Sequence, residues 1–191
     1  RPDTETLIEA ALAWIPDEPC FIADIGAGSG CIGLTLALER PQCKIYSVDI
    51  APEPLTCTRA NVEKHGLKER VGVLKGDLLT AIPPNRPVDW VLSNPPYIPT
   101  ADIAGLEPEV RDQEPRVALD GGADGLSFYR RLATQAARRA SRGILVEVGA
   151  GQAPAVQQLM VQAGFEEVEL KKDLGGIERV VAARHPEAPR Q

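Results

Sequence analysis

Short apolar runs without polar interruptions alternate with helical stretches along most of this 191-residue chain. Such runs are typical of strands covered on both faces, and their alternation with helices predicts a parallel sheet between two helical layers. We predict strands at Cys20–Ile25, Lys44–Asp49, Val71–Lys75, Val88–Ser93 and Gly143–Val148, and helices at Thr4–Ile15, Cys31–Glu39, Pro52–His65, Leu126–Ala140 and Gln152–Ala163. Because 191 residues with 43% hydrophobic side chains fill one core, we expect residues 1–191 to form a single domain.

The last part of the chain departs from this alternation. Two strand-like runs, Glu166–Lys172 and Ile177–Arg184, are separated by only four residues. A parallel connection needs about a dozen residues, so these two strands must pair antiparallel. The sequence therefore predicts an α/β fold with a mostly parallel, seven-stranded sheet and a C-terminal antiparallel hairpin, unlike the plain dinucleotide-binding layout. A long stretch without periodicity, Ile98–Gly125, follows the fourth strand, and loops of this length are usually functional or disordered.

The charge balance bears on the class of partner. Lys and Arg number 21 against 27 Asp and Glu, which gives a formal net charge of −6. Binding a long polyanion needs clustered basic side chains, and the nearest approach is the group Arg130, Arg131, Arg138, Arg139 and Arg142. On a helix this group is typical of a solvated outer face, so we expect no direct nucleic-acid binding.

The cysteines and the hydropathy pattern bear on metal binding and location. The four cysteines, Cys20, Cys31, Cys43 and Cys57, form no C-x-x-C pair, so we expect no metal site. Cys20 and Cys31 are predicted to be small buried residues, as in a reducing compartment. No apolar run has the length of a membrane span and no signal peptide is visible, so we expect a cytoplasmic protein without membrane contact. The sequence leaves the oligomeric state open.

A glycine-rich turn follows the first predicted strand. The run Asp24-Ile25-Gly26-Ala27-Gly28-Ser29-Gly30 leads directly into the next helix. Glycines allow a sharp turn and the close approach of a ligand, and the free N–H groups of a helix N-terminus favour a carboxylate or phosphate. The candidate residues for binding a nucleotide-like cofactor are therefore Asp24, Ile25, Gly26, Ala27, Gly28 and Gly30.

Acidic residues at the ends of the next two strands support a cofactor site. Asp49 ends the second strand, where a carboxylate accepts hydrogen bonds from both ribose hydroxyls. After the third strand, Asp77 is placed to accept from the exocyclic amine of an adenine, and the backbone N–H of Leu78 to donate to its ring. A nicotinamide dinucleotide prefers a third glycine where this chain has Cys31. The glycine spacing instead resembles the S-adenosylmethionine loop of the Rossmann-like class I methyltransferases.

The fourth predicted strand runs directly into Asn94-Pro95-Pro96-Tyr97. The Asn94 side-chain oxygen and the Pro95 carbonyl can each accept one hydrogen of a planar –NH2 group, and Tyr97 can stack on that group. Consecutive prolines fix φ and hold these carbonyls rigidly. An amide nitrogen held in this way needs in-line placement against a methyl donor more than it needs a basic side chain. We therefore predict that Asn94, Pro95, Pro96 and Tyr97 form the catalytic site.

Further segments narrow the choice of acceptor. They are Arg1-Pro2-Asp3-Thr4-Glu5, Glu114–Leu119, Asp120–Gly125, Phe128-Tyr129-Arg130 and Asp173–Arg179. Together with Asn94–Tyr97 they resemble the release-factor glutamine methyltransferase family over essentially the whole chain. The resemblance implies methyl transfer from S-adenosylmethionine to the side-chain amide nitrogen N5 of the glutamine in the Gly-Gly-Gln motif of peptide-chain release factors.

The same resemblance implies roles for individual residues. Asn94 through Tyr97 would bind the target glutamine, and Asp24 through Gly28, Asp49 and Asn94 would contact the cofactor. Family members often carry an aromatic residue where this chain has Leu78, so we expect an apolar contact to the adenine without ring stacking. They usually have a small helical docking domain before the position of Arg1, which we expect to be absent from this catalytic domain.

Two other functions are weighed against this one. The Asn-Pro-Pro-Tyr motif is shared with nucleic-acid amino-methyltransferases that modify adenine in DNA or guanine in ribosomal RNA, but the acidic charge and the segments Arg1–Glu5 and Glu114–Leu119 disfavour that class. A noncatalytic S-adenosylmethionine-binding scaffold is disfavoured by the intact motif. The roles of five further residues stay open: Arg1, Glu5, Glu114, Arg116 and Glu147.

Overall fold

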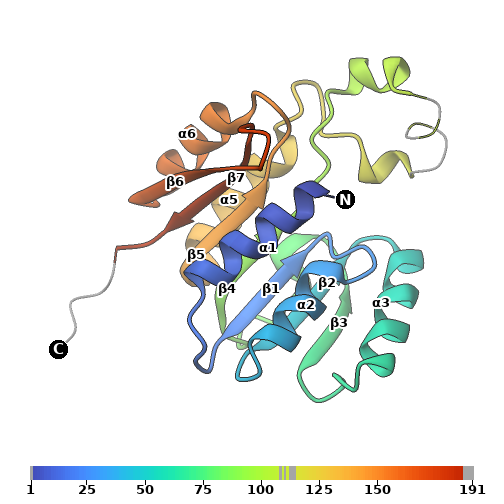
Figure 1. The fold of residues 1–191 in the computed structure, drawn as a ribbon, viewed down its shortest axis with the longest axis vertical. Coiled ribbons are helices and arrows are strands. Elements are labelled where there is room, and N and C mark those ends of the chain that lie inside the picture. Colours follow the sequence, from blue (N-terminus) through green and yellow to red (C-terminus); the bar gives the residue numbers. More distant parts are fainter. Residues whose placement is uncertain (1, 108, 110, 112–114, 187–191) are drawn as a thin grey trace.

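The computed structural model describes residues 2–107, 109, 111 and 115–186, and its centre is one seven-stranded sheet (Figure 1). The strands are β1 (Phe21–Ile25), β2 (Lys44–Asp49), β3 (Val71–Lys75), β4 (Val88–Ser93), β5 (Ala140–Glu147), β6 (Glu167–Lys172) and β7 (Glu178–Arg184). The α-helices are α1 (Pro2–Trp14), α2 (Cys31–Glu39), α3 (Pro52–Lys64), α5 (Ser127–Arg139) and α6 (Ala153–Ala163), and the 3₁₀ helices are η1 (Leu78–Ala81), η2 (Thr100–Gly105) and η3 (Arg116–Ala118).

The order and direction of the strands confirm the predicted fold class. The order across the sheet is β3-β2-β1-β4-β5-β7-β6. The first five strands in this order are parallel, whereas β7 pairs antiparallel with both β5 and β6. Asp173 closes the short turn between β6 and β7, since its carbonyl accepts from Gly176 N (3.0 Å) and its Oδ1 from Ile177 N (2.9 Å). A turn this short returns the chain beside itself, which makes the hairpin antiparallel.

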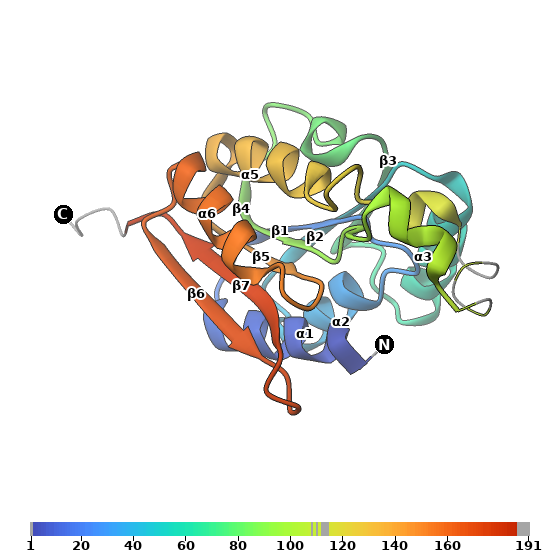
Figure 2. The same ribbon diagram turned by 90° about the horizontal axis from the view of Figure 1, so that it is seen from above.

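Helices lie on both faces of the sheet (Figure 2), and an apolar core lies between the sheet and the helices on each face. Helices α1, α2 and α3 cover one face, and η1, α5 and α6 cover the other. Neighbouring residues of one strand belong to different cores. In β1, Ile22 packs into the core on one face and Ala23 into the core on the other, and in β4 the same holds for Leu92 and Val91. Both faces of the central strands are therefore buried, which explains why their sequences are continuously apolar rather than alternating.

The largest error among the predicted boundaries, which otherwise differ by one or two residues at most, lies between α5 and β5. Helix α5 ends at Arg139 and β5 begins at Ala140, whereas we predicted a helix through Ala140 and a strand from Gly143. Ala140 is buried and pairs with Val88 across an irregularity of the β4–β5 ladder. Strand geometry therefore starts as soon as the helix ends. The alanines and arginines before this point have high intrinsic helix propensity, and pairing with β4 overrides that propensity at Ala140.

The long segment between β4 and α5 contains η2 and η3 and projects from the carboxyl edge of the sheet (Figure 1). Its two ends are joined at the base, where Ile98 bridges to Asp120. Ile98 N donates to the Leu119 carbonyl (3.0 Å), and Gly121 N donates to the Ile98 carbonyl (2.8 Å). The chain that leaves Tyr97 thus returns to the same place before α5 begins.

The burial predicted for the cysteines is wrong in one case. Cys20 and Cys43 are buried, with their Sγ atoms 2.8 Å apart, but Cys31 is exposed. Cys31 is the first residue of α2, and the buried stripe of that helix starts at its neighbour Ile32. A position just before the apolar stripe faces outward, so burial of Cys31 does not follow from its place at the helix start.

None of the helices that the structure describes is both long enough and apolar enough to cross a membrane. Within the same residues, no group of three or more His, Cys, Asp or Glu side chains is arranged to hold a metal ion.

Candidate functional site

The centre of the sheet lies between β1 and β4, which are parallel neighbours in register at Ile25 and Ser93. The chain leaves β1 toward α2 on one face, and after β4 it reaches α5 on the other. The carboxyl ends of two strands with such opposite connections are the usual ligand site of open α/β sheets. Ser93 Oγ donates to the Ile25 carbonyl (2.7 Å), so these two strand ends are tied together directly below the site.

The glycine turn after β1 leaves room for a ligand. Gly26, Gly28 and Gly30 have φ of +71°, +58° and +83°, a region in which other side chains are strained. The N–H groups of Gly26 and Ala27 both donate to the Val48 carbonyl (2.8 and 2.9 Å), which fastens the turn to β2. A Cβ at Gly26 or Gly28 would meet no atom within 4 Å, so the space over these two glycines is open.

Gly30 and Asp24 make packing contacts that the sequence did not reveal. Gly30 is buried, and a Cβ there would lie 2.5 Å from Leu34 Cδ1. The Asp24 side chain is fully buried, and its Oδ2 accepts from Gly33 N (2.9 Å). The pKa of Asp24 is raised to about 7, mainly because burial disfavours its charged form; the hydrogen bond from Gly33 lowers this pKa, and the charge of Asp49 raises it. These contacts hold the start of α2 in place rather than lining the open space over the turn.

Asp49 ends β2 and is half-buried beside the glycine turn. Its carboxylate accepts from two backbone N–H groups, Gly28 N at Oδ2 (2.9 Å) and Ala51 N at Oδ1 (3.0 Å). A carboxylate oxygen has two acceptor positions, so each oxygen of Asp49 keeps one for a further donor. Asp49 therefore fixes the turn and offers a carboxylate to hydroxyl groups bound next to it.

The turn after β3 carries the two other predicted cofactor contacts. Asp77 forms a partly exposed ion pair with Arg131. Leu78 is the one non-glycine residue within the described part of the chain that has a positive φ (54°), and its side chain is only 3% exposed. Backbone strain of this kind is frequent at ligand sites. Because the Leu78 side chain is packed into the core, the apolar contact to an adenine that we predicted for it has little surface available.

The segment Asn94–Tyr97 begins directly after β4 and is firmly held. Pro95 is buried, and the other three residues are half-buried. Gln152, at the start of α6, donates from Nε2 to the Tyr97 carbonyl (2.8 Å) and accepts at Oε1 from Gly149 N (3.0 Å). This bridge joins the segment to the loop after β5. Nothing in the sequence singles out Gln152, because its role depends on contacts between distant parts of the chain.

Glycines from two loops pack behind Tyr97. A Cβ at Gly149 would lie 2.8 Å from Tyr97 Cδ2, and a Cβ at Gly121 would lie 2.8 Å from Tyr97 Cα. A Cβ at Gly125 would lie 2.5 Å from the Tyr97 carbonyl oxygen. Real Cβ atoms do not approach so closely, so only glycine fits at these three positions. The glycines of Asp120–Gly125 thus support the predicted catalytic tyrosine by packing.

Asn94 has a side-chain partner from the first turn of α1. Asn94 Nδ2 donates to Thr4 Oγ1 (3.3 Å), and Thr4 Oγ1 donates to Glu147 Oε2 (3.3 Å). Glu147 is fully buried at the end of β5, and the Tyr129 hydroxyl donates to its carbonyl (2.8 Å). Three distant parts of the sequence meet here. The sequence pointed to Thr4 only as part of the segment Arg1–Glu5, and it gave no indication that Thr4 contacts Glu147.

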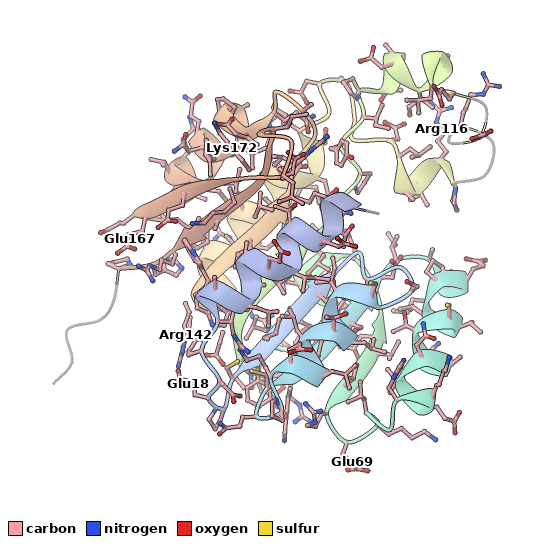
Figure 3. All side chains as sticks on the ribbon, viewed as in Figure 1. Glu18, Glu69, Arg116, Arg142, Glu167 and Lys172 are labelled. Atoms are coloured by element: carbon pink, nitrogen blue, oxygen red, sulfur yellow. The ribbon has the colours of Figure 1, made fainter. Side chains whose placement is uncertain are left out.

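Of the other residues of open role, Glu5 and Arg116 are described by the structure, and both lie apart from this group. Glu5 is exposed on α1. Arg116 lies in the projecting segment, where its Nε is 3.5 Å from Asp120 Oδ2 (Figure 3). Exposed pairs of this kind contribute little to stability. Arg1 and Glu114 lie outside the described residues.

The arrangement suits an extended ligand that reaches from the glycine turn toward Asn94. The backbone of Gly26 and Gly28 leaves open space, and each oxygen of the Asp49 carboxylate keeps one acceptor position for a further donor such as a hydroxyl. Gly26 and Asn94 follow paired residues of adjacent strands, and adjacent strands are about 4.8 Å apart. A group bound at the turn and a planar amine bound at Asn94 would therefore be neighbours at the same edge of the sheet.

Sequence comparisons find relatives with one common name. The chain matches the family described as Methyltransferase small domain over residues 8–105. The release factor glutamine methyltransferase of Rhodospirillum rubrum is 48% identical over 186 residues, which cover 96% of this chain and 57% of that protein. The Geobacter sulfurreducens protein of the same name is 42% identical and covered to 64%, and that of Bacillus cereus is 41% identical and covered to 67%, each over 96% of this chain.

Solved structures share the fold at low identity. The hMettl16 catalytic domain, in complex with hairpin 6 of the MAT2A 3'UTR, has a TM-score of 0.72 at 17% identity, over 95% of this chain and 71% of that one. Magnesium protoporphyrin IX methyltransferase (ChlM) from Synechocystis PCC 6803 with bound SAM has a TM-score of 0.64 at 13% identity, over 96% of this chain and 80% of that one. These likenesses concern the fold alone.

The curated relatives are far more similar to this chain in sequence than the solved structures are. They match nearly the whole chain at 41–48% identity, although the chain spans only 57–67% of their own length. The predicted family is confirmed: this chain belongs to the release factor glutamine methyltransferase family.

Proposed function

We propose that residues 1–191 are a catalytic domain that transfers a methyl group from S-adenosylmethionine to glutamine N5 in the Gly-Gly-Gln motif of peptide-chain release factors. The observation that carries the proposal is the placement of Asn94–Tyr97 one strand away from the glycine turn, at the carboxyl ends of β4 and β1. The shared name of the relatives supports release factors as the acceptor. Translation termination takes place in the cytoplasm, and we propose that location for the reaction.

S-adenosylmethionine fits the open side of β1 and β2. When bound, it supplies a methyl group made electrophilic by a positively charged sulfur. Gly26 and Gly28 leave open space in which its amino-acid part would bind, and Asp49 would accept from the ribose hydroxyls. Asp77 would accept from the adenine amine, and its charge is partly balanced by Arg131. The methyltransferase from Synechocystis, which shares this fold, was solved with SAM bound.

The acceptor amide is held by Asn94 and Pro95. The Asn94 Oδ1 and the Pro95 carbonyl accept the two amide hydrogens, and the Tyr97 ring, backed by Gly149, covers the amide plane. The lone pair of an amide nitrogen is delocalised, so the chain contributes alignment and stabilises the positive charge that develops on the nitrogen. Both contributions come from carbonyl oxygens with fixed positions, which cost no rearrangement during the reaction.

The basic side chains of α5 and β5 favour a protein acceptor over a nucleic acid. Arg130 pairs with Asp124, and Arg131 with Asp77. Arg142 pairs with Glu18 at the far edge of the sheet from the projecting segment (Figure 3). These arginines serve contacts within the chain, and the net charge of −6 opposes a polyanion.

Mass spectrometry tests the proposal. A release factor is incubated with this chain and with S-adenosylmethionine that carries a deuterated methyl group. We expect one labelled methyl on the glutamine of the Gly-Gly-Gln motif, and none on a release factor in which alanine replaces that glutamine. Label found in RNA or DNA instead would indicate a nucleic-acid methyltransferase. Cofactor binding without transfer to any acceptor would indicate a noncatalytic scaffold.

Asn94 variants test the amide-binding mechanism. Asn94→Ala should lower the transfer rate by about 10²–10³ because it removes one positioned acceptor. Asn94 is half-buried after the last buried strand residue, so melting should change only modestly. Asn94→Asp keeps an acceptor oxygen and should retain more activity than Asn94→Ala. Wild-type turnover by Asn94→Ala would contradict the mechanism.

A further inference from the structure

We infer that Thr4 and Glu147 form a positioning relay, a chain of two hydrogen bonds that fixes which way the Asn94 side-chain amide faces. In the fixed orientation the site favours an acceptor group that donates N–H. The inference rests on the proposed function, because it assigns the Asn94 oxygen to the acceptor nitrogen. The observations behind it are two hydrogen bonds in sequence, Asn94 Nδ2 to Thr4 Oγ1 and Thr4 Oγ1 to Glu147 Oε2, each 3.3 Å long.

The direction of the relay follows from counting hydrogens. Glu147 Oε2 accepts from Thr4 Oγ1, and the threonine hydroxyl has a single hydrogen. When that hydrogen is donated to Glu147, Thr4 Oγ1 can only accept from Asn94. Asn94 must then present its NH2 group to Thr4. In the flipped orientation, the Asn94 oxygen would face the hydroxyl oxygen with no hydrogen between them.

The orientation matters because the two ends of an amide have nearly the same shape. With its NH2 group toward Thr4, Asn94 turns its oxygen to the opposite side. That oxygen accepts, so it suits the –NH2 of a glutamine side chain and repels the carboxylate of a glutamate. Without the relay, Asn94 would present either end to the incoming group.

The relay has a rigid base. Glu147 is fully buried, and its carbonyl accepts from the Tyr129 hydroxyl (2.8 Å). Glu147 also pairs with Val180 of the antiparallel strand β7, and the next residue, Val148, donates to the Arg179 carbonyl (2.8 Å). The two relay bonds, each 3.3 Å, are longer than is usual for O–H···O and N–H···O bonds. The fully buried end of the relay is therefore Glu147, which is two hydrogen bonds away from Asn94.

Thr4→Val is the central variant, since valine keeps the branched shape of threonine and lacks its hydroxyl. We expect kcat/KM for the release factor to fall about tenfold, while the Kd for S-adenosylmethionine stays unchanged. Thr4→Ser should restore most of the activity. Thr134→Val is the matched control, because Thr134 is exposed on α5 and its hydroxyl bonds only to its own helix, at the Arg130 carbonyl.

A double-mutant cycle separates positioning from general stability. In an Asn94→Ala background there is no amide to orient, so Thr4→Val should lower the rate no further. An additional fall of the same size in that background would show that Thr4 acts through the fold, and would overturn the relay. If Thr4→Val melts too early for assay, Glu147→Gln replaces a group that only accepts by one that also donates, and should lose activity to a similar degree.

An NMR measurement tests the relay without any turnover. The sequence has three asparagines, Asn61, Asn85 and Asn94, so the side-chain NH2 signals of Asn94 are identified by their loss in Asn94→Ala. We expect these signals to shift in Thr4→Val and to stay in place in Thr134→Val. Unchanged Asn94 signals in Thr4→Val would overturn the relay. Wild-type protein that fails to methylate a release factor would overturn the proposed function instead, while the NMR result still decides the relay.

Discussion

The Asp49 carboxylate has two roles: it accepts hydrogen bonds that hold the glycine turn, and we propose that it also binds the ribose. We expect Asp49→Ala to weaken S-adenosylmethionine binding by at least about tenfold, since bonds to a charged acceptor contribute roughly 1.5–3 kcal/mol each. Isothermal titration calorimetry measures this loss, with Asp17→Ala, an exposed loop carboxylate, as the control. Unchanged affinity would remove Asp49 from the site. Measurable NAD affinity in the wild-type protein would favour a dinucleotide site.

Asp24 makes the stability of the ligand-free protein depend on pH. Burial raises its pKa to about 7 from an ordinary value of 3.8. Stability from this group is thus fully present below pH 3.8 and is lost as pH rises through about 7. The full span corresponds to at most roughly 4 kcal/mol. The melting temperature of the wild type should fall relative to that of Asp24→Asn between pH 4 and 8, and parallel curves for the two proteins would contradict this.

At the scale of elements, the sequence predicted most strands because their physical cause is local. Continuous apolar runs follow from burial on both faces, so β1, β2, β3 and β4 lie within a residue of their predicted bounds. The start of β5 was missed because it depends on pairing with β4, a contact distant in sequence. The same distinction holds for the site. Local motifs predicted the glycine turn and Asn94–Tyr97, whereas the contacts of Gln152 with Tyr97 and of Thr4 with Glu147 join distant parts of the sequence and could not be predicted.

The loop after β5 should influence transfer although it carries none of the predicted catalytic residues. In Gly149→Ala, the new Cβ would stand 2.8 Å from both the Tyr97 ring and Gln152 Oε1, so the ring and the bridge must shift. We expect release-factor methylation to fall severalfold at unchanged cofactor affinity. Gly72→Ala is the control, because its Cβ would meet its nearest neighbour, Tyr46 Cδ1, at an ordinary 3.8 Å. Equal activity of the two variants would mean that Tyr97 tolerates displacement.

At the scale of the whole molecule, the chain spans only 57% of the Rhodospirillum rubrum relative. We propose that the part of that relative outside the match helps to grip the release factor, because the resemblance implies a docking domain. The full-length relative should then methylate its release factor with a higher kcat/KM than a version trimmed to the matched region, mainly through KM. Identical constants for the two would place docking within the matched region, with the segment between β4 and α5 the natural candidate.

The contact between Thr4 and Glu147 spans 143 residues, and that separation has a consequence during synthesis. At about 5–20 residues per second, Thr4 leaves the ribosome on the order of 10 s before Glu147 is made. The region 8–105, which matches the methyltransferase family, contains the glycine turn and Asn94 but neither end of this contact. A nascent chain that has completed this region therefore still has an unoriented Asn94. Under the proposed relay, Asn94 is oriented only when β5 takes its place in the sheet, so unfinished chains would carry the motif without the contact that orients it.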